Sequence, residues 1–350
     1  MPETPEAKKA EDRRIAITST IPVEIVFAAG LEPVDLNNRF ITSPDSKRMV
    51  EEAEGAGFPI NFCAWIKGIY GYAKRSGIKR VIGVMEGDCS NTHLLLEILE
   101  EEGVEIVPFQ YPLDRDAGRL KAAMERLAGA LGTTLERAEE LRLAMQPLRR
   151  KLERLDEMTW RDGTITGLEN HVWLINSSDM RGDWRAFEAE LDAFLAQAGK
   201  REPVTGGFRL GFVGIPPIID DLYQALAARG AYIVYNEFQR QFSMPGVFSD
   251  LVEQYLAYTY PYRTSLRAAD IAREARSRRL DGTVHYVQSF CFRQLQDRLI
   301  RRSTDVPVLT LEFDRPGRLD GRSITRMEAF LEVLERRSPK RLRPHVREDS

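Results

Sequence analysis

The feature that most constrains the fold is a pattern that occurs twice along the chain. A short apolar run, an Ile-Pro pair, a helical segment that ends at a glycine and a second apolar run follow one another over residues 14–36. The same order returns over residues 208–235. Short β-rich runs that alternate with amphipathic segments are typical of α/β layers with parallel strands. We therefore expect two similar α/β halves.

Further segments extend each half. The segments with strand character are 80–85, 105–109, 283–287 and 308–313. Helices are expected at 90–102 and 323–336, from the Pro216-Pro217 pair to Gly230, and over the long charged stretch 114–158. Opposite charges along that stretch are typical of an exposed helical face.

The predicted domain organisation follows from these segments and from chain length. A chain of 350 residues exceeds what one hydrophobic core usually supports. The stretch 199–207, which contains glycine and proline, is the predicted linker. We expect a tail (1–13), an N-terminal α/β domain (14–113), a helical excursion (114–200) and a C-terminal α/β domain (201–350).

Composition excludes some partners and compartments. A net charge of −3, from 50 basic and 53 acidic residues, gives no basic excess for nucleic acid. No apolar run reaches about 18 residues, so no membrane span is expected. The charged N-terminal stretch has no apolar core of the kind found in a secretory signal. The expected location is the cytoplasm.

The cysteines are the residues of this sequence best suited to bind a metal. The chain has three, Cys63, Cys89 and Cys291, and an odd number cannot all pair within it. Each falls at a predicted strand-to-helix junction, where a helix N-terminus favours thiolate. Cytosolic disulfides are rare, so converging thiols favour a metal. Three thiolates without an obvious fourth ligand suit a 4Fe–4S cluster with one open iron, although the spacing fits no known finger or ferredoxin. The alternative is inert, buried thiols.

Five segments, which together contain all three cysteines, resemble the 2-hydroxyacyl-CoA dehydratase family, which also includes subunits of ATP-dependent benzoyl-CoA reductase. The resemblance runs in order through most of the chain. The segments are TIPVEIVFAAGLEPVDL (20–36), NFCAWIKG (61–68), EGDCSNTHLLLEIL (86–99), DGTVHYVQSFCFRQ (281–294) and the stretch from Val306 to Glu332.

The resemblance implies two flavodoxin-like (Rossmann-like) parallel-sheet domains with an added helical segment and a cleft between them. It implies one 4Fe–4S cluster per chain in that cleft, held by Cys63, Cys89 and Cys291. It also implies a homodimer or a heterodimer with a related subunit, and an ATP-dependent iron–sulfur activator as the electron donor.

The implied reaction is the radical dehydration of a 2-hydroxyacyl-CoA. One electron reduces the thioester to a ketyl, water is eliminated, and the electron is recovered. The alternatives are a subunit of a benzoyl-CoA-type reductase and a non-catalytic subunit that relays electrons. This chain departs from the family pattern at 236–245, where Glu237 is the only acid, and at 258–267, which lacks a cysteine seen in some relatives. These gaps leave the substrate open.

Six further residues are candidates for the site. Glu24 is a predicted base, or a charge that stabilises its helix N-terminus. His285 is a predicted proton donor or cluster partner, or a histidine satisfied in the core. The predicted substrate-binding residues, whose alternatives are helix caps and solvated surface, are Ser19, Thr20, Ser90 and Arg263.

Overall fold

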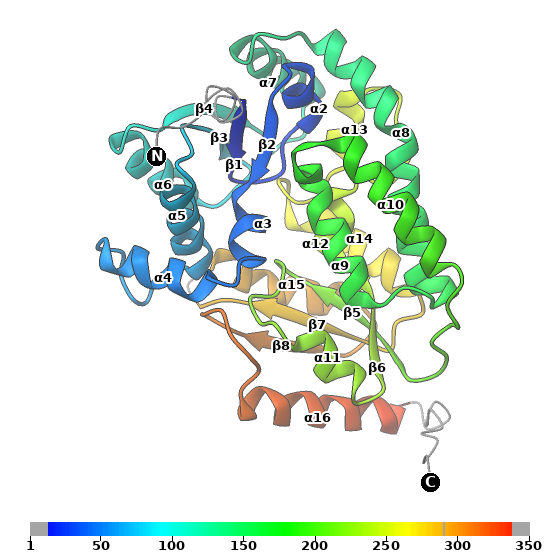
Figure 1. Ribbon diagram of the computed structural model, residues 1–350. Coiled ribbons are helices and arrows are strands. Elements are labelled where there is room, and N and C mark those ends of the chain that lie inside the picture. The colour runs from blue at the N-terminus through cyan, green and yellow to red at the C-terminus, as the bar shows by residue number, and fades with distance from the viewer. Residues whose placement is uncertain (1–12, 290, 338–350) are drawn as a thin grey trace. The chain divides into compact units, whose positions relative to one another are not determined.

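The computed structural model describes residues 13–289 and 291–337, and the chain divides into two compact units (Figure 1). Unit 1 comprises Met1–Arg150, Asn176–Glu190 and Phe242–Arg263. Unit 2 comprises Lys151–Ile175, Leu191–Gln241 and Thr264–Ser350. The units are thus built from interleaved segments, whereas the sequence suggested consecutive domains. The predicted tail lies outside the described residues except for Arg13.

Unit 1 contains a four-stranded parallel sheet in the order β2-β1-β3-β4. Its strands are β1 (Arg14–Ile17), β2 (Glu32–Asp35), β3 (Arg80–Glu86) and β4 (Glu105–Gln110). Residues of the two central strands such as Ile15, Ile17 and Ile82 have no exposed surface. Parallel sheets are covered on both faces, which is why these strands are continuous apolar runs. Pro108 is tolerated because β4 is an edge strand.

Helices surround this sheet, and two of them carry cysteines at their starts. The helices that lie wholly in unit 1 are α2 (Val23–Ala28), α3 (Leu36–Ile41), α4 (Ser46–Gly55), α5 (Ala64–Ser76), α6 (Ser90–Glu101), α7 (Ala117–Ala130) and α13 (Leu251–Ala257), with the short turns η2 (Asn176–Ser178) and η3 (Met180–Gly182). The chain passes between the units within α8 (Leu135–Glu157), α10 (Trp184–Ala198) and α12 (Glu237–Phe242). The charged stretch 114–158, predicted to be helical, forms two helices, α7 and α8, with a break at residues 131–134.

Glycines allow α5 to pack closely against its neighbours. A Cβ added at Gly68 would lie 2.2 Å from the Phe40 ring, and one at Gly71 would lie 2.6 Å from the Met49 carbonyl oxygen. Helix α5 then ends at Gly77, whose φ of 63° is the left-handed conformation that glycine adopts without strain. Larger side chains at these positions would displace the helix that begins after Cys63.

Unit 2 repeats the topology of unit 1, with the parallel sheet order β6-β5-β7-β8. Its strands are β5 (Phe208–Val213), β6 (Ala231–Asn236), β7 (Gly282–Val287) and β8 (Val308–Glu312). Its helices are η1 (Met158–Asp162), α9 (Gly167–Ile175), α11 (Leu222–Ala227), α14 (Thr264–Ser277), η4 (Phe292–Gln296), α15 (Asp297–Ser303) and α16 (Gly321–Arg337). Two parallel sheets with flanking helices confirm the predicted α/β class with two flavodoxin-like domains.

One predicted helix of unit 2 begins later than expected. The sequence suggested a start at Pro216-Pro217, but α11 begins at Leu222. Ile219 forms a β-bridge with Gly317, and the Asp220 N–H donates to the Gly317 carbonyl oxygen at 2.9 Å. These bonds hold the residues just before α11 in an extended conformation. Pro216 and Pro217 have no backbone N–H that could form helical hydrogen bonds in their place.

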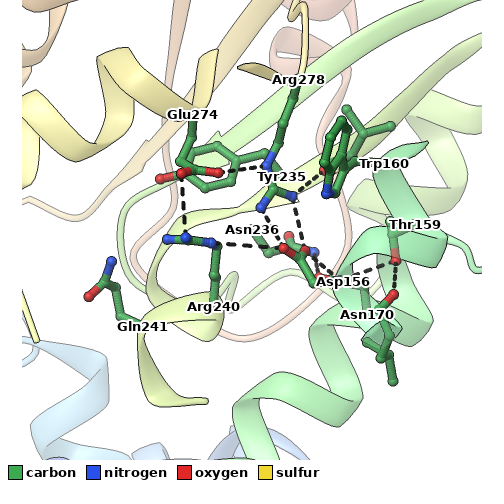
Figure 2. Close-up of polar contacts among 12 residues, drawn as sticks. Asp156, Thr159, Trp160, Asn170, Tyr235, Asn236, Arg240, Gln241, Glu274 and Arg278 are labelled. Atoms are coloured by element: carbon green, nitrogen blue, oxygen red, sulfur yellow. Dashed lines mark hydrogen bonds and ion pairs between the residues drawn. The ribbon is translucent and has the colours of Figure 1, made fainter. Parts of the chain in front are cut away.

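A buried ionic network holds several elements of unit 2 together (Figure 2). Asp156 accepts from both terminal nitrogens of Arg278, with 3.0 Å between Nη1 and Oδ1, and from Asn170 Nδ2 at 3.1 Å. Glu274 accepts from Arg278 Nε at 3.0 Å, and Arg240 lies 3.4 Å from Glu274. Figure 2 shows dashed contacts from Asp156 to both Arg278 and Arg240. Breaking a buried pair by removing one partner typically costs about 3–5 kcal/mol, so this network fixes the packing.

No helix among the described residues is long and apolar enough to cross a membrane.

Candidate functional site

All three cysteines lie in the described part of the chain, and each occupies the N-cap position of a helix. Cys63 precedes α5, Cys89 precedes α6 and Cys291 precedes η4. Each is partly buried, and none is in a disulfide. Cys89 and Cys291 follow strands, as predicted, whereas Cys63 lies between helices α4 and α5 and does not follow a strand.

The topology of unit 1 places two of the cysteines at the same edge of the sheet. Helix α5 leads into β3 and α6 follows it, so both helices run antiparallel to the strand and start at its carboxyl end. The two helices are in contact (Figure 1). Cys63 and Cys89 pack against one hydrophobic core. The carboxyl edge of a parallel sheet is the usual place for ligands in this architecture.

Cys291 occupies the equivalent place in unit 2. Strand β7 has the position in its sheet that β3 has in the other, and Cys291 follows β7 as Cys89 follows β3. The Cys291 N–H donates to the Gln288 carbonyl oxygen at 3.3 Å, and the Cys291 carbonyl accepts from the Gln294 N–H at 2.9 Å. Each unit thus presents a cysteine after its third strand in chain order.

The surroundings of Cys89 raise the pKa of its thiol. Burial is the main cause, and the adjacent Asp88 carboxylate is the second. A contact of 3.4 Å between the sulfur and Thr92 Oγ1, and the backbone N–H groups of the first turn, act in the opposite direction without prevailing. The expected effect of the helix N-terminus is therefore present but outweighed. A bound metal would take the place of the thiol proton.

The donor chemistry fits a thiolate-ligated group. Sulfur ligands favour soft metal centres such as iron–sulfur clusters, and none of the three cysteines is in a disulfide. Within the described residues no group of three or more His, Cys, Asp or Glu side chains is gathered at one metal-binding position. Cys63 and Cys89 belong to unit 1 and Cys291 to unit 2, so joint ligation by all three is part of the proposal below.

Glu24 has a dense set of partners inside unit 1. It has no exposed surface, and its Oε1 accepts from the Arg149 guanidinium and from Gln254 Nε2, the latter at 2.8 Å. Its Oε2 accepts from the Tyr255 hydroxyl at 2.9 Å. Burial raises the pKa of Glu24, but the Arg149 charge and the hydrogen bonds bring it below its usual value. These contacts give Glu24 an anchoring role, and its catalytic role stays a prediction.

His285 is held from one side by a carboxylate. Its Nδ1 lies 2.7 Å from Asp297 Oδ1, and only 1% of the residue is exposed. A carboxylate can only accept, so Nδ1 carries the proton of the neutral ring and Nε2 is left as an acceptor. Burial lowers the pKa of His285 despite the facing Asp297. The ring is therefore neutral at pH 7, and its role toward a cluster or substrate stays a prediction.

The predicted substrate-binding residues differ in accessibility. Ser19 is half-buried after β1, whereas Ser90 and Arg263 are exposed. Thr20 is buried, and its Oγ1 has no hydrogen-bond partner in the described part of the chain. Arg267, four residues after Arg263, is buried, with Nη2 2.7 Å from Glu237 Oε2.

Sequence reasoning missed the carboxylates beside two of the cysteines. Asp88 Oδ1 accepts from the Cys89 N–H at 2.8 Å, and the Tyr260 hydroxyl lies 3.4 Å from the same oxygen. Glu312 and Asp314 contact the segment around Cys291. The signal for Asp88 was its place directly before a cysteine. The signal for the other two was an acid pair at the end of a predicted strand.

Unit 2 also contains a cavity of about 270 Å³ beside the edge strand β6. Its lining is mostly apolar and includes Ile165, Tyr223, Tyr232 and Ile233. None of the predicted site residues lines it.

Comparison with known proteins adds the last observation. The family model described as 2-hydroxyglutaryl-CoA dehydratase, D-component, matches residues 18–334. No curated protein matches the chain.

Proposed function

The chain belongs to the 2-hydroxyglutaryl-CoA dehydratase D-component family, and from this premise we propose that it is the cluster-bearing subunit of a radical 2-hydroxyacyl-CoA dehydratase. The observation that carries the proposal is the placement of all three cysteines at helix N-caps, with Cys89 and Cys291 in equivalent places of a repeated fold. Unrelated structural thiols have no reason to share such positions.

We propose that Cys63, Cys89 and Cys291 together hold one 4Fe–4S cluster. When bound, such a cluster would supply the single electron that elimination from a 2-hydroxyacyl thioester requires, and take it back afterwards. The thiols would bind as thiolates, so loading releases protons. The high pKa of the Cys89 thiol makes that loading dependent on pH.

The protein's own polar groups have the remaining roles in the proposal. Ser19 and Thr20 lie in the turn after β1 and Ser90 is the first residue of α6, and their hydroxyls are suited to donate hydrogen bonds to a thioester oxygen or to cluster sulfurs. Arg263 is exposed and suited to a phosphate of coenzyme A. His285, whose Nδ1 faces Asp297, is the candidate for proton transfer or for contact with a cluster sulfur through Nε2.

The partners in the proposal follow from the family. They are an acyl-CoA substrate, a related or identical second subunit, and an ATP-dependent iron–sulfur activator in the cytoplasm. The D-component assignment supports an activator and an acyl-CoA substrate in general terms. The acyl group remains open.

The test is purification under strict anaerobiosis, followed by iron and sulfide analysis and by EPR of the dithionite-reduced protein with and without acyl-CoA. We expect about four irons per chain and a spectrum that acyl-CoA alters, because an open iron binds the substrate oxygen. Four irons without a response to acyl-CoA would favour an electron-relay subunit. Reduction of an aromatic thioester ring in place of dehydration would favour the reductase branch.

The matched variants are Cys63→Ser, Cys89→Ser and Cys291→Ser. Each should lower iron content after reconstitution, since a cluster that loses one of three thiolates is bound less tightly. Absence of iron from the unsubstituted protein after reconstitution would refute the proposal.

A further inference from the structure

Two carboxylates at the carboxyl end of β8 hold the chain on both sides of Cys291. The Ser289 hydroxyl donates to Glu312 Oε1 at 2.6 Å, and the Ser289 N–H donates to Asp314 Oδ1 at 2.8 Å. On the other side, Gln294 Nε2 donates to Glu312 Oε2 at 2.8 Å. A single carboxylate therefore joins the residue two positions before the cysteine to the residue three positions after it.

Among residues 13–289 and 291–337, no cation competes for these carboxylates. In the part of the chain that the structure describes, neither Glu312 nor Asp314 forms an ion pair with lysine or arginine, although both side chains are exposed. Their side-chain hydrogen bonds go to Ser289 and Gln294. Hydrogen bonds to an ionised acceptor are shorter and about twice as strong as neutral ones. The two acids therefore act on the cysteine segment and on little else.

Strand β8 supplies a rigid base for this contact. The Phe313 N–H donates to the Val287 carbonyl oxygen at 3.2 Å, and the Tyr286 hydroxyl donates to the Phe313 carbonyl oxygen at 3.2 Å. Residues 312–314 are thus tied to the end of β7 by backbone and side-chain bonds. The carboxylates on either side of Phe313 then reach forward to Ser289 and Gln294.

We propose that Glu312 and Asp314 are positioning residues that set the conformation of the Cys291 segment before a metal group binds. The inference rests on the proposed function in one respect, namely that Cys291 is a metal ligand. A ligand held in its bound conformation pays less ordering entropy on binding, and groups behind the ligands orient them. Neither acid needs to touch the metal group.

The test uses the full chain without metal, under reducing conditions. Hydrogen exchange of residues 286–296 and the rate of iodoacetamide alkylation of Cys291 are measured by mass spectrometry, with Cys63 and Cys89 as internal references. Glu312→Ala should raise both rates at Cys291 by about tenfold, because loss of a charge-assisted hydrogen bond on each side is worth at least 1.4 kcal/mol, or about one factor of ten. The reference cysteines should be unchanged.

Two kinds of control keep the test decisive. Glu332→Gln removes an equally exposed carboxylate from α16, where it lies 3.8 Å from Arg336, and should change neither rate. Ser289→Ala and Gln294→Ala each remove one side of the contact and should give part of the effect. They also replace Glu312→Ala if that variant fails to fold.

A holoprotein measurement then links positioning to ligation. Glu312→Ala should lose iron to a chelator faster than the unsubstituted protein, with Asp314→Asn intermediate. Unchanged exchange and alkylation at Cys291 in all of these variants would overturn the inference. If the rates change as expected but the unsubstituted chain binds no iron, the proposed function fails while the positioning of the thiol stands.

Discussion

Glu24→Gln separates an anchoring carboxylate from a catalytic one. The substitution keeps the shape of the side chain but removes the charge that faces Arg149, a residue only 5% exposed. Removing one partner of a buried ion pair typically destabilises by about 3–5 kcal/mol, because the remaining charge is left unpaired. The Gln254 and Tyr255 hydrogen bonds to the same carboxylate would weaken as well. We therefore expect the free energy of unfolding of unit 1 to decrease by an amount at the upper end of that range.

The pH dependence of this contribution has a definite sign. Burial raises the pKa of Glu24, but the Arg149 charge and the hydrogen bonds overcome that effect, so the net pKa is lowered. A carboxyl whose folded-state pKa is depressed stabilises the protein above its unfolded-state pKa. The contribution is therefore complete at neutral pH and is lost as the pH falls through the folded-state pKa.

The assay is hydrogen exchange of residues 14–41 and 242–263, which contain Glu24 and its partners on α13. Glu97→Gln, at an exposed position of α6, is the matched control and should change stability by less than about 0.5 kcal/mol. The double variant Glu24→Gln/Arg149→Met should be more stable than Glu24→Gln alone, because neither charge is then left buried without its partner. Unchanged exchange together with lost turnover in Glu24→Gln would refute the anchoring role and support the catalytic one.

Two further predictions concern other buried carboxylates. Burial, and then the charge of Asp35, raise the pKa of Asp179 to about 6, so unit 1 should lose about 3 kcal/mol as the pH rises from about 4 to 7. Asp179→Asn should flatten that slope in hydrogen exchange, and a slope that survives would contradict the assignment. Asp156→Ala should destabilise unit 2 by about 3–5 kcal/mol by leaving Arg278 short of a partner, whereas Asp192→Ala, at an exposed pair, should cost less than about 1 kcal/mol. If Asp156→Ala and Asp192→Ala shift urea unfolding equally, the buried ionic network contributes little to the stability of unit 2.

The fold class could be predicted because the pattern is local. Short runs rich in β-branched residues, such as 80–85, indicate buried strands, and the helices between them end at glycines such as Gly30, whose φ is 71°. The helix expected from Pro216 was placed too early because a bridge from Ile219 to Gly317, almost 100 residues away, holds that stretch extended. Local propensity carries no information about such a partner.

Some features of the candidate site could likewise be predicted from the sequence, and others could not. The sequence by itself determined the three cysteines and their places at helix starts, since both depend on neighbouring residues along the chain. Only the tertiary structure decided that Glu24 faces Arg149, 125 positions away, and that Glu312 joins Ser289 to Gln294. The physical reason is that a charge looks the same in a sequence whether it is solvated or buried. Folding selects its partner by bringing together elements that the chain separates.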